Sequence, residues 1–271
     1  MKINTPVLAL AAVVVSLGLA ACGGPAGGTA GTADSRADGR TPVAEPGPKG
    51  AKEPGTKDTK PHRLLWMGDS IGEAGAPALK AAVEASGAGF ASMASAGGGG
   101  VVGEMAAPTW ATLTKELASF KPDVVAYQIT TYDWGTVTEQ RAAYGRLAET
   151  VNKAGADLLI VSAPPFRIDD FYKPHTAAIK TAPRSAAAIA DEHPDTVRFL
   201  DASALWGSDS AADAAQRSKD GIHTCQQGAA AFAGWFGKEL GKRYGFAPAA
   251  PATWATGAWT GDKVYGPLGC A

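Results

Sequence analysis

The chain has 271 residues, with 25 basic and 26 acidic side chains. This near-balance produces no large field of one sign, so the charge gives no support for nucleic-acid binding. Charged residues make up 19% of the chain and apolar residues 45%, which excludes a protein that is disordered throughout. The length fits one or two folded domains.

The first 22 residues have the pattern of a secretion signal. Lys2 precedes an apolar run from residue 7 to residue 21, which is short for a membrane span and typical of a signal-peptide core. Cys22 follows two alanines, an arrangement that resembles the lipidation site of a bacterial lipoprotein. We therefore expect a lipid anchor on Cys22 that holds the protein at the extracytoplasmic face of the cell membrane. The alternative is an ordinary secretory signal, which would leave the protein secreted.

Residues 23–61 have the composition of a tether. They contain nine glycines and six prolines and no aromatic residue. Such a segment buries too little apolar surface to offset the entropy of ordering the chain, so we expect it to be disordered. The remaining residues, 62–271, are predicted to form one domain.

Strands and helices alternate along this predicted domain. Short apolar runs predict strands at residues 63–67, 89–94, 123–130, 157–163 and 196–200, and the segments after them predict helices at 71–86, 111–119, 139–154, 177–192 and 226–244. Pro77 is expected to break or begin the first of these helices. The alternation predicts an α/β fold with three αβα layers around a five-stranded parallel sheet. Ligands of such sheets bind at the carboxyl ends of the strands.

Polar residues gather at those predicted strand ends. The segments concerned are Gly68-Asp69-Ser70 after the first strand, Gly97 to Gly100 after the second, Thr130 to Trp134 after the third, and Asp220 and His223 before the last helix. A serine, a histidine and an aspartate at one edge of a sheet are the groups that a serine nucleophile requires.

These motifs resemble the SGNH, or GDSL, hydrolase superfamily over about residues 63–245. The resemblance implies a flavodoxin-like sheet and a serine esterase in which Ser70 is the nucleophile. It also implies that His223 is the general base and that Asp220 orients its imidazole. Two alternatives stay open: Asp201 as the acid, and helix capping as the role of Ser70.

The same resemblance implies an oxyanion hole formed by the amides of Ser70 and Gly97 and a side chain after the third strand. The family has Asn there, in a Gly-x-Asn-Asp block, whereas this chain has Tyr132 in that position. The Tyr132 hydroxyl is the predicted donor, with Thr131 as the alternative. The departure leaves two outcomes open: a less efficient oxyanion hole, or a descendant without activity.

The remaining cysteines, Cys225 and Cys270, form an even pair in an oxidising compartment. This predicts a disulfide between them that fastens the C-terminal tail to the segment around His223. Two free thiols are the alternative.

These observations predict an extracytoplasmic serine ester hydrolase that acts through an acyl-enzyme. Its predicted substrates, from resemblance and location, are short acyl (O-acetyl) esters of cell-surface glycans or small molecules. The alternatives are an acyltransferase with a sugar hydroxyl as acceptor, and a non-catalytic SGNH-like binding lipoprotein. No cofactor or metal is expected, because the chain has no nucleotide-binding or metal motif. We expect a monomer with no nucleic-acid partner.

Overall fold

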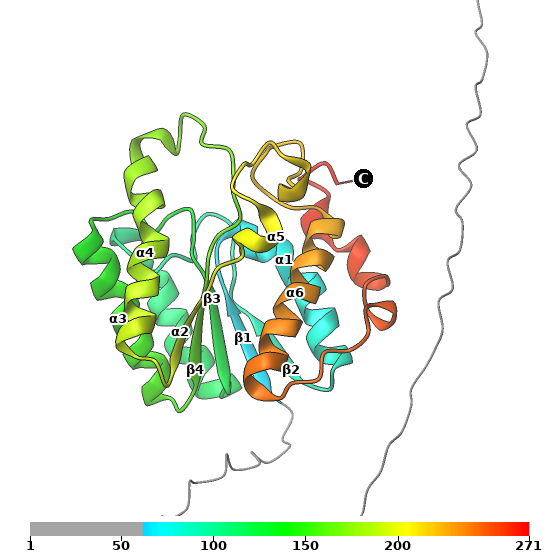
Figure 1. Ribbon diagram of the computed structural model, residues 1–271, viewed down its shortest axis with the longest axis horizontal. Coiled ribbons are helices and arrows are strands. Elements are labelled where there is room, and N and C mark those ends of the chain that lie inside the picture. The colour runs from blue at the N-terminus through cyan, green and yellow to red at the C-terminus, as the bar shows by residue number, and fades with distance from the viewer. Residues whose placement is uncertain (1–61, 271) are drawn as a thin grey trace, which may run out of the picture. The chain divides into compact units, whose positions relative to one another are not determined.

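The computed structural model describes residues 62–270. The predicted signal peptide, the lipidation site Cys22 and the predicted tether lie outside the described residues. Five strands form one parallel sheet in the order β2-β1-β3-β4-β5 (Figure 1). They are β1 (Arg63–Met67), β2 (Gly89–Ser92), β3 (Val124–Gln128), β4 (Asp157–Val161) and β5 (Val197–Leu200). The predicted five-stranded parallel sheet is therefore confirmed.

Helices cover both faces of the sheet, as the three-layer prediction requires (Figure 1). One face carries α1 (Ser70–Ala85), α5 (Ser203–Trp206) and α6 (Gln226–Tyr244). The other carries α2 (Ala107–Phe120), α3 (Val137–Lys153) and α4 (Thr176–Glu192). Within residues 62–270, none of the helices is both long enough and apolar enough to cross a bilayer.

The strand β1, between β2 and β3, is buried on both faces. Leu64 and Trp66 join the core beneath α1 and α6, whereas Leu65 and Met67 join the core beneath α2, α3 and α4. The chain order reverses at β1, which pairs with β2 on one side and β3 on the other. Such a switch point leaves a crevice at the carboxyl ends of the strands, and the loops after β1 and β3 both open there.

The helix α1 continues through Pro77, so the expected break at this residue is wrong. Proline removes one helical hydrogen bond and disfavours a helix interior. Asp69 caps the N-terminus of α1, and Ala74, Ala78 and Leu79 are buried on the helix on either side of Pro77. The packing of α1 against α6 therefore outweighs the local cost of the proline.

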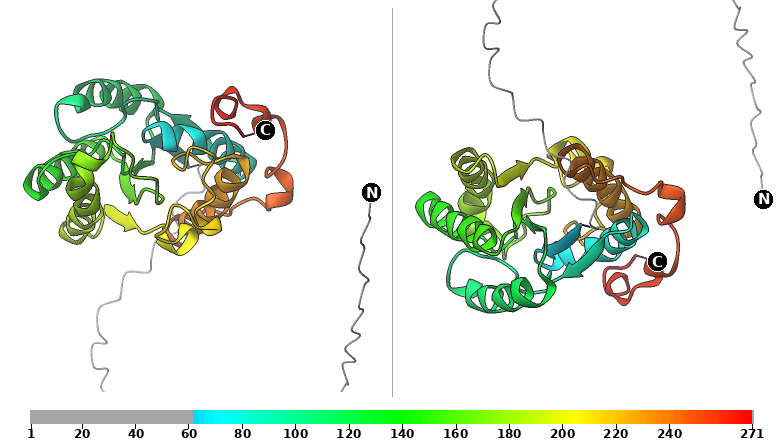
Figure 2. Two further views of the ribbon diagram at one scale, coloured as in Figure 1. Left: turned by 90° about the horizontal axis from the view of Figure 1, so that it is seen from above. Right: turned by 90° about the horizontal axis from the view of Figure 1, so that it is seen from below.

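The residues after α6 fold back beside α1 (Figure 2). They form short 3₁₀ helices, of which η5 (Ala258–Gly261) and η6 (Lys263–Tyr265) contact α1. Tyr265 is buried and donates its hydroxyl to the carbonyl of Ala74 at 3.0 Å. Cys270 forms a disulfide with Cys225 at the start of α6, as the cysteine count predicted. A buried hydrogen bond and a disulfide thus help to fix the tail to the domain.

Candidate active site

Ser70 is the first residue of α1, immediately after the β1 end. Asp69, rather than Ser70, caps the helix, because its Oδ1 accepts the N–H of Ile71 at 3.0 Å. The capping alternative for Ser70 therefore fails. The N–H of a first-turn residue has no acceptor within the helix, and it lies at the positive end of the helix dipole. The Ser70 amide is thus suited to binding an anion.

The second carboxylate oxygen of Asp69 joins the β1 end to the β3 end. Oδ2 accepts the backbone N–H of Thr131 at 2.7 Å and the Thr131 hydroxyl at 2.9 Å. Asp69 is 1% exposed, and burial raises the pKa of its carboxyl against the opposing effect of these hydrogen bonds. Because the Thr131 hydroxyl donates its hydrogen to Asp69, it is not directed at an oxyanion.

The structure brings Ser70, His223 and Asp220 together. The Nε2 atom of His223 lies 2.8 Å from Ser70 Oγ, although the residues are 153 positions apart. The Nδ1 atom of the same ring lies 2.6 Å from Asp220 Oδ2. A hydrogen on Nδ1 leaves the Nε2 lone pair facing the serine hydroxyl, which is the arrangement a general base requires.

Asp220 is held by its own loop. Its Oδ1 accepts the Ser218 hydroxyl at 2.7 Å and the backbone N–H groups of Ile222 at 2.7 Å and His223 at 2.9 Å. Burial alone would raise the pKa of Asp220, but the hydrogen bonds from the His223 ring, Ile222, Ser218 and the His223 amide outweigh it. The pKa of Asp220 therefore lies well below its ordinary value. The carboxylate stays ionised beside the imidazole.

Two further residues shape this loop. Gly221 has a φ of +72°, which favours glycine, and a Cβ there would make a tight contact of 3.1 Å with the Cβ of Arg167. Arg217 donates from Nη1 to the carbonyl of Ile222 at 3.1 Å and lies over the Trp206 ring at 4.7 Å. Burial lowers the pKa of Arg217 to about 10. No sequence motif pointed to Arg217 as a support of the histidine loop.

Asp201, the alternative acid, has a local role. Its Oδ1 accepts the N–H of Ser203 at 2.9 Å and the Ser162 hydroxyl at 3.4 Å, at the start of α5. The imidazole of His223 is paired with Asp220 instead.

The glycine-rich loop after β2 approaches Ser70 because it lacks side chains. A Cβ on Gly99 would lie 2.0 Å from the carbonyl oxygen of Gly68, and Gly99 has a φ of +84°. Gly97 has a φ of +72° and lines the same cleft as Ser70 and His223. The loop therefore brings backbone amides to the edge where an oxyanion would form.

Tyr132, which occupies the expected Asn position, lies in an aromatic cluster. Its ring centroid is 5.4 Å from that of Trp134 and 6.3 Å from that of Phe171. Burial, followed by the charge of Asp69, raises the pKa of Tyr132, so the hydroxyl keeps its hydrogen. Tyr132 is half-buried and does not line the cleft that Ser70, Gly97 and His223 share.

Asp133, next to Tyr132, is a buried hydrogen-bond acceptor at the β3 end. Its Oδ2 accepts the hydroxyls of Tyr127 at 2.5 Å and Tyr144 at 3.0 Å, and its Oδ1 accepts the N–H of Val101 at 3.1 Å. The N–H of Thr130 donates to it at 3.2 Å. Asp133 therefore fastens the glycine-rich loop to the β3 end.

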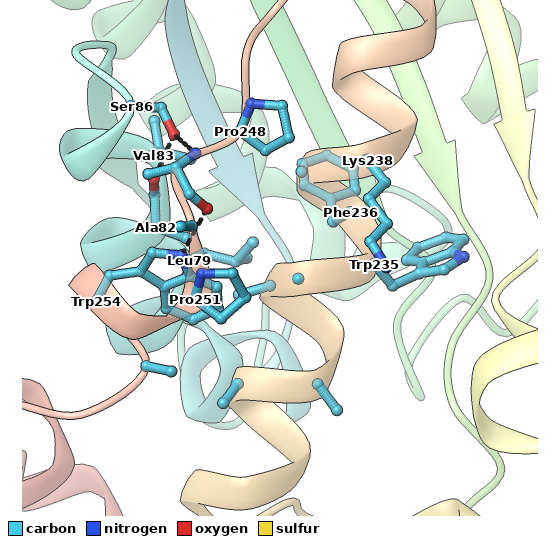
Figure 3. A pocket seen from close by; sticks show the side chains of 18 of the residues that line it. Leu79, Ala82, Val83, Ser86, Trp235, Phe236, Lys238, Pro248, Pro251 and Trp254 are labelled. Atoms are coloured by element: carbon cyan, nitrogen blue, oxygen red, sulfur yellow. Dashed lines mark hydrogen bonds between the residues drawn. The ribbon is translucent and has the colours of Figure 1, made fainter.

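Ser70 and His223 open into a cleft of about 840 Å³. A second cavity of about 600 Å³ lies between α1, α6 and the tail, where Leu79, Trp235 and Trp254 line it (Figure 3). No predicted site residue lines the second cavity. The first cleft is therefore the candidate site, because Ser70, Gly97 and His223 line it.

No family model matches the chain, and no curated protein matches it. Solved structures do. A candidate SGNH hydrolase from Slackia heliotrinireducens matches with a TM-score of 0.50 and 20% identity, over 66% of this chain and 100% of that chain. A candidate acylhydrolase from Bacteroides fragilis matches with a TM-score of 0.53 and 14% identity, over 68% and 89% of the two chains. A candidate GDSL-like lipase from Bacteroides ovatus matches with a TM-score of 0.52 and 14% identity, over 70% of this chain and 55% of that one.

The chain therefore has the SGNH hydrolase fold, as the motifs around Ser70 and His223 predicted. The roles of the individual side chains rest on the geometry described above.

Proposed function

We propose that the protein is a serine ester hydrolase that acts through an acyl-enzyme on Ser70. The observation that carries the proposal is the continuous path of hydrogen bonds from Asp220 through His223 to Ser70. This path opens into a cleft at the carboxyl ends of the strands. A resting structural network would not need a serine that lines a cleft at its end.

The acylation step follows from the positions of these atoms. Ser70 Oγ attacks the ester carbonyl while His223 Nε2 takes the serine proton, and Asp220 stabilises the resulting imidazolium. The Ser70 and Gly97 amides are the proposed donors to the oxyanion, with the Tyr132 hydroxyl as a weaker third. A well-placed donor of this kind lowers the barrier by about 3 kcal/mol. Collapse of the intermediate expels the alcohol, which receives the proton from His223.

Deacylation reverses the roles of the same groups. His223 removes a proton from water, the water oxygen attacks the acyl carbonyl, and Ser70 leaves with that proton. A sugar hydroxyl in place of water would give acyl transfer instead.

The proposed substrates are short acyl esters, chiefly O-acetyl groups on cell-surface glycans, and the proposed location is extracytoplasmic. The disulfide between Cys225 and Cys270 supports an oxidising compartment. The proposed lipid on Cys22 would place the cleft near surface polymers.

The test compares hydrolysis of 4-nitrophenyl acetate by the full chain and by its Ser70→Ala variant. We expect the variant to lose at least about 10³-fold in kcat/KM. Ser119→Ala is the matched control, because Ser119 is exposed on α2 and bonds only to the Lys115 carbonyl within that helix. It should keep the full rate.

Equal rates for the full chain and Ser70→Ala would remove Ser70 as the nucleophile and favour a binding protein. A fluorophosphonate adduct on Ser70 would support covalent catalysis. Acetylated product formed on an added glycan acceptor would identify acyl transfer.

A further inference from the structure

The cleft at Ser70 continues along α1 as a groove. Ser70, Glu73, Pro77 and Lys80 all line it. Their spacing of three, seven and ten residues places them on one face of the helix. At about 1.5 Å per residue, the groove follows α1 for roughly 15 Å from the nucleophile. We call this continuation the α1 groove.

The opposite side of the α1 groove is formed by the tail. Its lining residues there lie within residues 262–268, which we call the C-terminal wall. Tyr265 in this wall is 2% exposed and bonds to the Ala74 carbonyl, and Cys270, two residues after Leu268, is held by the disulfide. The wall is therefore a fixed part of the domain. The bridge joins it to Cys225, two residues after His223.

The lining of the α1 groove is amphipathic. Its half-buried apolar members include Pro77, Phe90, Val264 and Leu268. Charged groups of both signs also line it, namely Glu73, Lys80, Asp262 and Lys263. Sugar rings present apolar C–H faces together with hydroxyls that both donate and accept hydrogen bonds. A glycan chain matches both parts of this lining, whereas an aliphatic chain would leave the charged groups unused.

The size of the cleft also favours a glycan as the occupant. An acetyl group would occupy a small part of the roughly 840 Å³ available. Ile71, next to Ser70, packs in a buried cluster with Phe166 and Tyr172, and none of the three lines the cleft. The large space lies along α1. An acetyl group does not need this space, so we assign it to the alcohol part of the ester.

We infer that the α1 groove binds several sugar units on the alcohol side of the ester, and that the C-terminal wall determines this specificity. The inference rests on the proposed function, because it takes Ser70 as the nucleophile. It assigns residues 262–268 to substrate selection, although they lie far in sequence from the catalytic motifs.

The test uses three substrates of the full chain: chemically O-acetylated chitopentaose, 4-nitrophenyl acetate and 4-nitrophenyl octanoate. Val264→Trp and Pro267→Trp each place a large side chain in the groove from the C-terminal wall. Pro267 is exposed, so its substitution leaves the core unchanged. We expect both variants to lose at least tenfold in kcat/KM on the chitopentaose and less than twofold on 4-nitrophenyl acetate. Ala255→Trp is the control, because Ala255 is half-buried on the same core but lines the second cavity.

The outcomes separate the inference from the proposed function. Unchanged rates on the chitopentaose in both groove variants would overturn the inference, as would equal losses on all three substrates. A loss confined to the octanoate would assign the groove to the acyl chain and also overturn it. Ser70-dependent hydrolysis of 4-nitrophenyl acetate without release from chitopentaose would overturn the inference alone. Ser70→Ala activity equal to that of the unmodified chain would overturn the proposed function itself.

Discussion

Two loops flank Ser70, and they use their polar groups in opposite ways. In the histidine loop, residues 218–224, the donors converge on Asp220, whose other oxygen faces the His223 ring. In the β3 loop, residues 130–134, the donors converge on the buried carboxylates Asp69 and Asp133. The side chain of Asp220 is 33% exposed, whereas Asp133 is 2% exposed. One loop aims a carboxylate at a reacting group, and the other uses carboxylates to hold strand ends.

This difference predicts how the loops respond to substitution. Loss of the acid in the histidine loop should reduce activity with little effect on stability, because the side chain of Asp220 is itself partly exposed. Loss of the buried acid in the β3 loop should reduce stability, because it leaves several buried donors without an acceptor. Tyr132 belongs to the second loop and should therefore contribute little to catalysis.

The largest expected effect is that of Asp220→Asn on activity. An amide in this position no longer requires a hydrogen on Nδ1 of His223 and favours the tautomer that cannot take the Ser70 proton. We expect kcat for 4-nitrophenyl acetate to fall by roughly 10³- to 10⁴-fold. The melting temperature should stay within a few degrees of that of the unmodified chain.

Asp201→Asn provides the matched control, since it removes the same charge from the alternative acid. We expect it to keep at least half of the activity, because its carboxylate bonds to Ser203 and Ser162. A large loss in Asp201→Asn together with an active Asp220→Asn would reverse the assignment of the acid.

Asp133→Asn should reduce stability rather than chiefly activity, the opposite of Asp220→Asn. The carboxylate accepts two tyrosine hydroxyls and two backbone N–H groups, and an amide cannot accept all four. We expect the free energy of unfolding to fall by about 3 kcal/mol, measured by urea denaturation. Asp213→Asn, at an exposed position, serves as the control. Identical denaturation midpoints for the two variants would show that Asp133 does not hold the β3 loop.

Sequence patterns predicted the parts of this molecule that depend on local chemistry. Apolar runs bounded by Gly68 and by Pro164 marked β1 and β4, and the spacing of Asp220 and His223 placed both on one turn. The 2.8 Å contact between His223 and Ser70 followed from the rule that parallel strands open their loops at one edge.

The features that the sequence did not reveal depend on packing between distant segments. Pro77 stays helical because α6 and the tail pack along α1, which no local propensity shows. Arg217 supports the histidine loop by donating to the Ile222 carbonyl, and it lies over the ring of Trp206. No motif in the neighbouring sequence indicates this role. The cysteine count predicted the disulfide of the tail. It did not predict that Tyr265 is buried against α1 and bonds to the Ala74 carbonyl.

The smallest expected effect, that of Tyr132→Phe, decides how far the two loops differ. Removal of a fully used oxyanion donor costs about 10²- to 10³-fold in kcat. Tyr132 lies outside the lining of the cleft and packs against Trp134 and Phe171, so we expect its loss to cost between two- and tenfold. Tyr244→Phe, at the end of α6, should have no effect on kcat and controls for removal of a half-buried hydroxyl. A loss of a hundredfold or more in Tyr132→Phe would show that tyrosine fully replaces the family's Asn. In that case the β3 loop would serve catalysis as directly as the histidine loop does.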